Sequence, residues 1–300
     1  MYKRQLPNPD GEKAAWNTFV NCDSYNNFDW WTVNGGVPAA GTNADGFAVK
    51  QGSGRGNRFI GCRAWNNSDD AWDLYECGHA VEMTDCWAWH TGHREDHVDM
   101  YADRTGGSLT EEVWAGDGNG FKMGGGCLDI SGRECRAYSK GTHLLRNCIS
   151  FDNAKKGFDQ NNHPMGAWIE NCLSFGNGIN FQFWKENTEG TGWVLRNNIS
   201  MNGARKDQFK GLTLLADDHN SWNLGIKGKP ADFVSLSAAD AAAPRGADGS
   251  LPEHFGRLAA GSAFIDRGAP TETVRGDGFA REPIPYNGSA PDLGAYEYNQ

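Results

Sequence analysis

The sequence predicts an all-β fold, a parallel β-helix in which short strands wind into a solenoid of stacked coils. The composition is one reason: 40 glycines among 300 residues, with many Asn and Asp, are typical of short strands joined by tight turns. A second is a recurring phrase of two short alternating strands around a small turn. The third is its spacing, which is 24 residues from Cys62 to Cys86 and again from Cys148 to Cys172. A period in this range fits one coil of a parallel β-helix.

The phrase recurs between about residues 16 and 211, which we expect to form the repeat core. It is centred on Cys22, Cys62, Cys86, Cys148, Cys172 and Asn198. An inward position that recurs once per coil forms a ladder, so we expect these cysteines to be free, small buried hydrophobes without chemistry. We expect the asparagines beside them to occupy left-handed turns or to bond along a side-chain ladder. They are Asn21, Asn147, Asn171 and Asn197.

We expect residues 1–300 to form one domain with two departures from the repeat. The 62 residues between Cys86 and Cys148 exceed two coils, so an insertion is expected at about residues 91–117. The sequence there, including HTGHREDHVDMYADRTGG, is polar, as an excursion at a functional face would be. Residues 212–300 lose the strand phrase. We expect them to form a loop-rich segment that caps or packs along the solenoid, because the last coil must be covered.

Charge and the ends of the chain restrict its partners. The formal net charge of −10 argues against nucleic acid, which requires a basic face. No apolar run is long enough to span a bilayer, and the start, MYKRQLPNPDGEK, lacks a hydrophobic leader. The strand phrase nevertheless begins almost at once near Trp16 with no capping element. We therefore expect that a leader or earlier coils precede this sequence, and that the protein is a monomer that is secreted or held at the cell surface.

Four aspartates are the main chemical candidates. Asp45 lies in NADGFAV, and Asp69 follows one coil length later, so the two are expected to be neighbours on adjacent coils. Asp70 and Asp73 lie with Asp69 in NNSDDAWD. A turn after Asn67 would bring these three aspartates around one point. Crowded carboxylates repel one another unless a cation neutralises them, and oxygen ligands suit Ca²⁺ better than Zn²⁺. Solvated turn aspartates are the alternative, and the spacing alone does not decide between them.

Lys122 favours the calcium interpretation. It lies in GNGFKMGG, and the phrases DGFAV and NGFKM look alike. If both occupy the same strand layer, Lys122 shares one face with the aspartates. A nearby divalent cation disfavours the ammonium form and lowers the pKa of a lysine, which then becomes a candidate base. An ordinary surface lysine is the alternative.

The chain resembles the pectate lyases of polysaccharide lyase family nine in DGFAVKQGSGRGNRFIGCRAWNNSDDAWDLYE, NGFKMGG and HLLRNCISFDNAKKGFDQNN. The likeness covers roughly residues 17 to 203. It implies a right-handed parallel β-helix, with Ca²⁺ held by Asp45, Asp69, Asp70 and Asp73 and with Lys122 as the Brønsted base. It also implies β-elimination on a uronic-acid polymer, pectate or polygalacturonate, in which calcium neutralises the uronate carboxylate and Lys122 removes the C5 proton.

Further contacts with an acidic polysaccharide are expected on the coils after Lys122. The phrase KKGFDQNN offers Lys155, Lys156, Asp159, Gln160 and Asn161. Basic side chains would pair with uronate carboxylates, and Arg133 or Arg136 would do likewise. Each of these residues has an alternative role as surface charge or as a turn residue.

The insertion is the departure from that family. Its histidines and aspartates have the spacing of a transition-metal site, although a polar loop that shapes the substrate groove is the preferred interpretation. They are His90, His93, His97, Asp96 and Asp99. The insertion leaves the polymer open, because the resemblance to family nine also implies lyases that act on other uronic-acid polymers, including thiopeptidoglycan.

Two other classes of function also fit the sequence. The first is a β-helix glycoside hydrolase in which Asp69 and Asp70 act as the acid and the base. It gives Lys122 no role. The second is a solenoid that binds polysaccharide without cleaving it.

Overall fold

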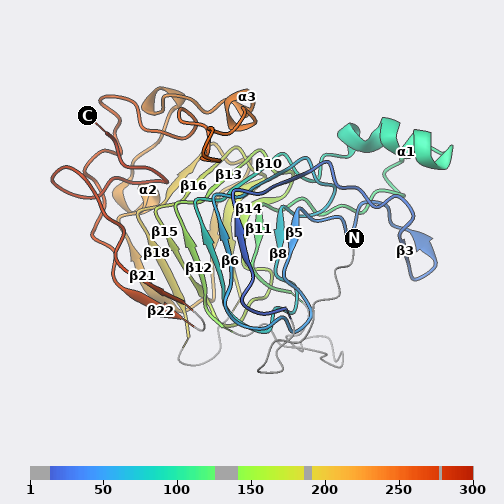
Figure 1. Ribbon diagram of the computed structural model, residues 1–300, viewed down its shortest axis with the longest axis horizontal. Helices are drawn as coiled ribbons and strands as arrows, with labels where there is room; N and C mark the ends of the chain where they lie inside the picture. The colour runs from blue at the N-terminus through green and yellow to red at the C-terminus, as the bar shows by residue number, and fades with distance from the viewer. Residues whose placement is uncertain (1–13, 126–140, 186–190, 277–278, 300) are drawn as a thin grey trace.

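The computed structural model describes residues 14–125, 141–185, 191–276 and 279–299. Strands in these ranges form three parallel sheets that run along a solenoid (Figure 1). Successive coils contribute one strand to each sheet and pair in parallel with the coil before. The predicted parallel β-helix is confirmed.

The strand order within each sheet follows the order of the coils. The first sheet contains β1 (Thr18–Val20), β6 (Asn57–Ile60), β9 (Val81–Thr84), β12 (His143–Arg146), β15 (Ala167–Glu170), β18 (Trp193–Arg196) and β21 (Leu214–Asp218). The second contains β2 (Asp23–Tyr25), β7 (Arg63–Trp65), β10 (Trp87–Trp89), β13 (Ile149–Phe151), β16 (Leu173–Phe175) and β19 (Ile199–Met201). The third contains β5 (Phe47–Ala48), β8 (Trp72–Asp73), β11 (Phe121–Lys122), β14 (Lys156–Asp159), β17 (Ile179–Phe183) and β20 (Gln208–Phe209).

Ladders of apolar side chains fill the interior of the solenoid, because each inward position recurs once per coil. The first sheet stacks the buried residues Phe59, Met83, Leu145, Ile169 and Leu195. The third sheet stacks Phe47, Trp72, Phe121, Phe158 and Phe181, with neighbouring ring centroids 4.9 to 5.0 Å apart. Offset-stacked rings at this separation stabilise the fold in addition to the stability gained by burying their surface area.

The predicted cysteine ladder and asparagine turns are confirmed. Cys62, Cys86, Cys148 and Cys172 are free and fully buried, and Cys22 on the first described coil is partly buried. The asparagines that precede this ladder all have left-handed backbone, with φ from 51° to 58°: Asn21, Asn147, Asn171 and Asn197. Asparagine tolerates this conformation better than most residues, which explains its recurrence between the first and second sheets.

The 62 residues from Cys86 to Cys148 make one coil, because the Ile149 N–H donates to the Cys86 carbonyl at 2.9 Å and β9 pairs directly with β12. An excursion occupies the predicted insertion and forms the 3-10 helix η1 (Arg94–His97) and the helix α1 (Val98–Thr105). Its two ends meet at Gly92 and Gly118, where a Cβ added to Gly92 would lie 2.4 Å from the Gly118 Cα. Only glycine permits this close approach.

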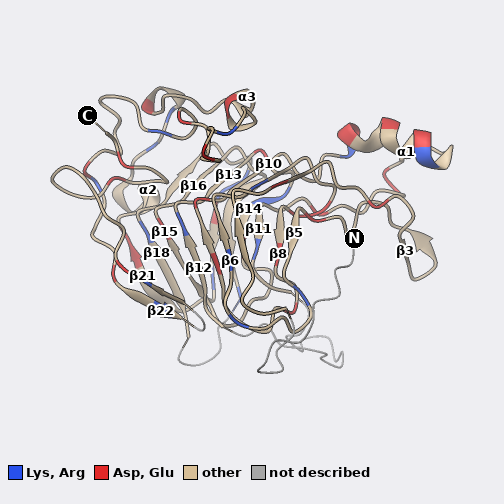
Figure 2. Ribbon diagram, viewed as in Figure 1, with Lys and Arg blue, Asp and Glu red and all other residues tan. Residues whose placement is uncertain are grey.

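The first described coil makes a second excursion, a hairpin of β3 (Val33–Asn34) and β4 (Val37–Pro38). The two excursions pack together around Phe28, Ala40, Leu109 and Trp114, and the Ala40 N–H donates to the Val113 carbonyl at 2.9 Å. They project from the solenoid on the side of β5 and β8 (Figure 1). Figure 2 shows acidic residues along α1, with one basic residue in its last turn.

The C-terminal segment caps the solenoid and then covers one of its faces. Helix α2 (Ser221–Leu224) places Trp222 against Phe181 and Phe209 at the end of the aromatic ladder. The chain then packs Phe255 and Leu293 against the outer side of the second sheet. The remaining elements are η2 (Pro230–Asp232), α3 (Ala238–Ala241), β22 (Val274–Gly276) and β23 (Phe279–Arg281). The described part of this segment thus contacts both the last coil and one face of the solenoid.

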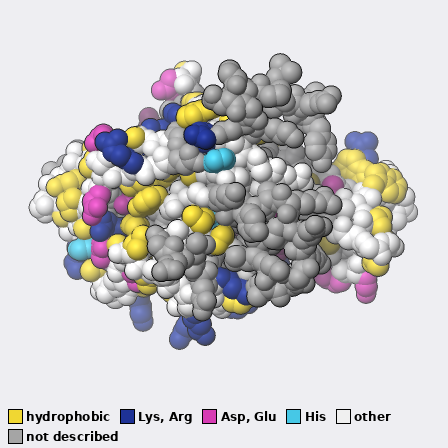
Figure 3. All heavy atoms as spheres, turned by 90° about the horizontal axis from the view of Figure 1, so that it is seen from below, with side chains coloured by type: hydrophobic (Ala, Val, Ile, Leu, Met, Phe, Trp, Pro, Cys, Tyr) yellow, Lys and Arg dark blue, Asp and Glu magenta, His cyan; other side chains and the backbone are white. Residues whose placement is uncertain are grey.

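Side chains of both charges share the surface. On the face seen from below, basic and acidic side chains are interspersed with hydrophobic ones (Figure 3). None of the helices in the described residues has the length and apolar character needed to cross a bilayer.

Phe158→Ala is expected to lower the free energy of unfolding by about 3 to 5 kcal/mol, because it leaves a cavity in the aromatic ladder. Phe158 is fully buried, with the rings of Phe121 and Phe181 each 5.0 Å away. Urea unfolding followed by tryptophan fluorescence measures the change. Val234→Ala, at an exposed position, is the control and should stay within about 0.5 kcal/mol of the parent. Equal values for the two variants would contradict a ladder that supports the solenoid.

Candidate active site

The third sheet positions the predicted catalytic residues. The rings of its aromatic ladder face inward, so the next residue of each strand faces outward. Lys122 pairs with Asp73 on the preceding coil and with Asp159 on the following coil. Ala48 takes the equivalent place on the coil before Asp73. The prediction that DGFAV and NGFKM occupy one strand layer is confirmed.

A second row lies two residues before the aromatic ladder and contains Asp45, Asp70 and Asn119. Asp45 and Asp70 are 25 residues apart, one more than the cysteine spacing, and the Asp70 N–H approaches Asp45 Oδ1 at 3.4 Å. Asp45 therefore lies opposite Asp70, and the predicted pairing of Asp45 with Asp69 is shifted by one residue. The cause is the loop between the second and third sheets, which does not keep the cysteine spacing.

Three of the four predicted ligands form a tight group. Carboxylate oxygens of Asp45, Asp70 and Asp73 all lie within 4.8 Å of one another, on side chains that are almost fully buried. Lys50 Nζ lies 2.7 Å from Asp45 and 2.5 Å from Asp73, while Lys122 Nζ lies 2.8 Å from Asp70 and 3.5 Å from Asp73. We call these five residues the acidic cluster, although two of them are lysines.

Asp69, the fourth predicted ligand, lies beside the acidic cluster. Its Oδ1 accepts a hydrogen bond from the Asp117 N–H at 2.8 Å. The Asp69 side chain also faces the groove described below. It is therefore close enough to interact with Asp70 electrostatically but is not one of the three carboxylates that converge.

The carboxylates of the site are held in an unfavourable environment. Burial raises the pKa of Asp45, Asp69 and Asp70 and is the largest cause for each. Repulsion from neighbouring carboxylates adds to it, whereas the Lys122 ammonium opposes the rise at Asp70. Several buried oxygen ligands that repel one another form a donor set suited to a hard divalent cation such as Ca²⁺.

The two lysines carry the compensating charge. Burial lowers the pKa of Lys122, but the carboxylates of Asp70, Asp73 and Asp69 outweigh burial and the pKa is raised. The pKa of Lys50 is raised in the same way, chiefly by Asp73 against the effect of burial. Both ammonium groups are thus stabilised as long as the carboxylates keep their charge.

Lys50 and Asn119 belong to the site but were not among the residues predicted from the sequence. Alternation along the strand signals Lys50, because Val49 is buried and the next side chain faces outward. Asn119 takes the place in NGF that Asp45 takes in DGF. Its backbone N–H and side-chain Nδ2 both donate to Asp70 Oδ1, at 2.9 and 2.7 Å. These bonds fix the orientation of the Asp70 carboxylate.

A groove of about 690 Å³ opens beside the acidic cluster. The excursion forms one wall with His93, Arg94 and Trp114, and the solenoid contributes Lys122 and Lys155 on the other side. Arg94 is fixed by a hydrogen bond from Nη1 to the Leu109 carbonyl at 2.9 Å. The insertion therefore shapes the groove, in agreement with the preferred interpretation of its sequence.

Two further predicted contact residues lie close to this groove. Lys155 lines it, and the Lys155 N–H donates to the Gly118 carbonyl at 2.9 Å, which fixes the backbone on the coil after Lys122. Lys156 Nζ lies 3.0 Å from Asp159 Oδ2 and compensates this buried carboxylate. Burial raises the pKa of Asp159, although Lys156 opposes the rise.

The other predicted contact residues lie elsewhere. The amide of Gln160 is buried, where its Oε1 accepts from the backbone N–H groups of Trp184 and Lys185 and its Nε2 donates to backbone carbonyls. Asn161 has left-handed backbone and donates from Nδ2 to the Gly124 carbonyl. Arg133 and Arg136 lie outside the described residues.

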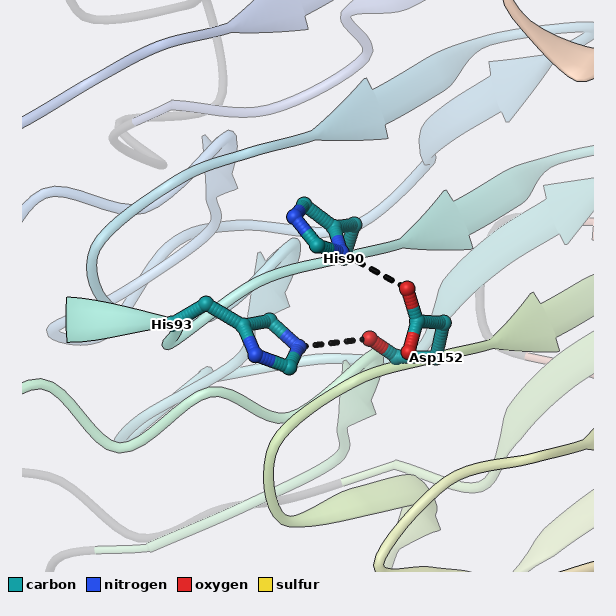
Figure 4. A group of neighbouring side chains, drawn as sticks. All are labelled: His90, His93 and Asp152. Atoms are coloured by element: carbon teal, nitrogen blue, oxygen red, sulfur yellow. Dashed lines mark hydrogen bonds and ion pairs between the residues drawn. The ribbon is translucent and has the colours of Figure 1, made fainter. Parts of the chain in front are cut away.

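The three histidines predicted as a possible metal site divide into two groups. His97 is buried, and its ring lies 4.9 Å from Phe28 and 5.6 Å from Trp114. His90 and His93 stack at 4.3 Å beside Asp152 from the next coil (Figure 4). A hydrogen bond to Asp152 is the largest cause that raises the pKa of His90. Asp96 contacts His90, whereas Asp99 is exposed on α1.

Comparisons with known sequences find one matching protein family and several relatives that are named as pectate lyases. Residues 6–202 match the family described as Pel9A-like, right-handed β-helix region. Pectate lyase L of Dickeya dadantii (strain 3937) is 36% identical over 289 residues, which cover 95% of this chain and 57% of the relative. Pectate lyase L of Paenibacillus polymyxa (strain SC2) is 33% identical, with 89% and 54% covered. The chain thus spans little more than half the length of these curated relatives.

Two solved structures share the fold. One is described as the crystal structure of pectate lyase Pel9A, with a TM-score of 0.70, 36% identity, and coverage of 95% of this chain and 60% of that chain. The other is described as rhamnogalacturonan lyase, with a TM-score of 0.62, 30% identity, and coverage of 82% and 58%. Both resemblances extend through most of the solenoid.

Proposed function

We propose that this chain, which belongs to the Pel9A-like right-handed β-helix family, cleaves a uronic-acid polymer of the pectate type by calcium-dependent β-elimination. The family match also confirms the resemblance to polysaccharide lyase family nine and the right-handed helix that it implied. One observation carries the proposed chemistry. Lys122 reaches the groove from within a group of buried carboxylates, with its Nζ 2.8 Å from Asp70.

In this proposal the calcium ligands are Asp45, Asp70 and Asp73, with Asp69 as a further oxygen donor beside them. Their buried, mutually repelling carboxylates fit a divalent cation. A bound Ca²⁺ would supply neutralisation of the uronate carboxylate, which makes the C5 proton more acidic and stabilises the enolate. Asn119 keeps the Asp70 carboxylate in place through its two hydrogen bonds.

Lys122 is the proposed base. Its Nζ removes the proton from C5, and the C5 electron pair forms the C4–C5 double bond. The C4–O bond breaks, and the glycosidic oxygen leaves with the electron pair of that bond and takes a proton from water. The carboxylates around Lys122 hold the proton on Nζ, which raises its pKa. Carboxylates engaged with a cation stabilise the ammonium less, so Lys122 loses its proton more easily when the site is loaded. Activity should therefore rise toward alkaline pH.

The groove supports an acidic polymer as the substrate. Arg94 and Lys155 line it and would pair with uronate carboxylates, and Lys156 lies on the same coil as Lys155. Pectate is the polymer named for the relatives, and one structural neighbour is named for rhamnogalacturonan instead. A polysaccharide does not cross a bilayer, so the proposal places the protein outside the cytoplasm.

The test is an assay of purified protein on polygalacturonate, rhamnogalacturonan and thiopeptidoglycan, each with added Ca²⁺ and with a chelator. A lyase forms an unsaturated sugar, so we expect ultraviolet absorbance to rise on polygalacturonate and to stop rising when the chelator is added. New reducing ends without this absorbance would instead support a hydrolase that uses Asp69 and Asp70. Binding without cleavage of any polymer would support a non-catalytic solenoid.

The stability gained from Ca²⁺ is expected to increase between pH 5 and pH 9. The folded-state pKa values of Asp45, Asp69 and Asp70 are raised, so without Ca²⁺ the folded protein binds more protons than the unfolded chain above about pH 4. Its free energy of unfolding therefore falls as pH rises through these values. Free Ca²⁺ at a hundred times its Kd would add about 2.7 kcal/mol.

Thermal unfolding at each pH, with Ca²⁺ and with a chelator, measures this difference. Asp85 lies outside the acidic cluster, and burial raises its pKa to about 6. Protonation of Asp85 therefore changes Tm both with Ca²⁺ and with the chelator, and this change cancels when the two Tm values are subtracted. A Ca²⁺-dependent shift in Tm that shrinks toward pH 9 would contradict the proposed ligands.

A further inference from the structure

One row of turn residues follows the strands of the second sheet. Its members all have left-handed backbone, with φ from 49° to 66°: Asn26, Asn66, His90, Asp152, Gly176 and Asn202. Asparagine and glycine satisfy this turn at four of the six positions, and Asn66 Nδ2 donates to Asn26 Oδ1 at 2.7 Å. His90 and Asp152 depart from the pattern on two adjacent coils, which places an imidazole beside a carboxylate.

The excursion adds a second imidazole at the same point. Figure 4 shows the rings of His90 and His93 beside Asp152, and the two ring centroids are 4.3 Å apart. His90 Nδ1 lies 2.6 Å from Asp152 Oδ2, and His93 Nε2 lies 2.9 Å from the Asp152 carbonyl oxygen. One potential ligand atom from each of the three side chains lies within 4.8 Å of the other two.

A second carboxylate orients His90. Its other ring nitrogen, Nε2, lies 2.8 Å from Asp96 Oδ2 on η1. A histidine that binds a metal through one nitrogen usually bonds a carboxylate or carbonyl through the other, which fixes the ring and its tautomer. With Asp96 at Nε2, His90 presents Nδ1 toward Asp152.

We propose that His90, His93 and Asp152 bind a divalent transition metal of the zinc class, with Asp96 as the residue that positions His90. Two imidazoles and one carboxylate are ligands that Zn²⁺ accepts, whereas Ca²⁺ takes oxygen ligands. The three side chains are 21% to 53% exposed, so an ion reaches them from solvent. A water molecule would complete four-coordination.

Such an ion would join the excursion to the solenoid. Its ligands come from the ends of β10 and β13 and from the segment that leads into η1. His93 also lines the groove, and Arg94 and Glu95 follow it in the same wall. The metal would thus hold this wall of the groove in place, at a site separate from the acidic cluster.

Isothermal titration of tag-free protein with Zn²⁺ tests the site. We expect one ion per chain, and we expect His90→Asn and Asp152→Asn to weaken binding by more than about tenfold, while Asp96→Asn weakens it about 10- to 100-fold. Asparagine occurs naturally elsewhere in this row, so the first two variants keep the turn. In the parent, Zn²⁺ should also slow amide hydrogen exchange in residues 94–105.

Two variants serve as controls. His219→Asn changes another histidine with left-handed backbone that lies next to a carboxylate, Asp218 at 3.2 Å, and should bind Zn²⁺ like the parent. Asp73→Asn should do the same, because it alters only the acidic cluster. The proposal is overturned if the parent binds no Zn²⁺, if His90→Asn and Asp152→Asn bind as tightly as the parent, or if Asp73→Asn loses the ion. Hydrogen exchange that is unchanged by Zn²⁺ would overturn the proposed hold on the wall.

Discussion

Lys122→Met is expected to lower turnover on the cleaved polymer by about 10² to 10⁴-fold, which is the usual contribution of a general base. Methionine keeps most of the length of the side chain but has no group that accepts the C5 proton. Asp70 retains both hydrogen bonds from Asn119 in this variant, so the site keeps its shape. The initial rate of ultraviolet absorbance at saturating Ca²⁺ measures the loss.

The Ca²⁺ affinity of Lys122→Met shows whether its activity falls because the base is lost or because the site is damaged. Lys122→Met removes one positive charge from beside the carboxylates, so Ca²⁺ affinity should stay equal or increase. Lys227→Met, which changes an exposed lysine, should keep full turnover. Full turnover by Lys122→Met on every polymer that the parent cleaves would disprove the assigned base.

The coil structure could be predicted because it depends on an inward position that repeats at constant spacing. The spacing from Cys62 to Cys86 and from Cys148 to Cys172 is set by strands and turns that are the same on each coil. The left-handed asparagines, such as Asn147 and Asn171, follow from the same rule because the turn between the first and second sheets does not vary. Sequence spacing was therefore a reliable guide for these two sheets.

The third sheet could not be aligned from that spacing. Most of its strands contain only two residues, and the loops that lead to them differ in length, so Asp45 pairs with Asp70 rather than Asp69. The 62 residues before Cys148 also make one coil, because excursions lengthen a coil without adding a strand to the stack. His90 and Asp152 each lie four residues after a ladder cysteine, but only the structure shows that these two coils are adjacent across the long connection.

Asp73→Asn is expected to raise the Kd for Ca²⁺ by at least about a hundredfold, or about 2.7 kcal/mol. Two unit charges 4 Å apart interact by about 4 kcal/mol at an effective dielectric constant of 20, so the loss of one buried ligand charge is sufficient. The change is nearly isosteric. Lys50 keeps its contact with Asp45, and Lys122 keeps its contact with Asp70, so both ammonium groups remain paired. Titration calorimetry of decalcified protein gives the Kd.

Variants of two other aspartates test whether the affinity for Ca²⁺ depends on the three carboxylates that converge. Asp103→Asn makes the same charge change on exposed α1, where solvent and salt screen it, and should alter the Kd by less than about twofold. Asp69→Asn should weaken Ca²⁺ binding, but less than Asp73→Asn does, because Asp69 lies beside the three convergent carboxylates and not among them. If Asp73→Asn binds Ca²⁺ like Asp103→Asn, the ion is held elsewhere, and the acidic cluster serves only to hold Lys50 and Lys122 as ammonium ions.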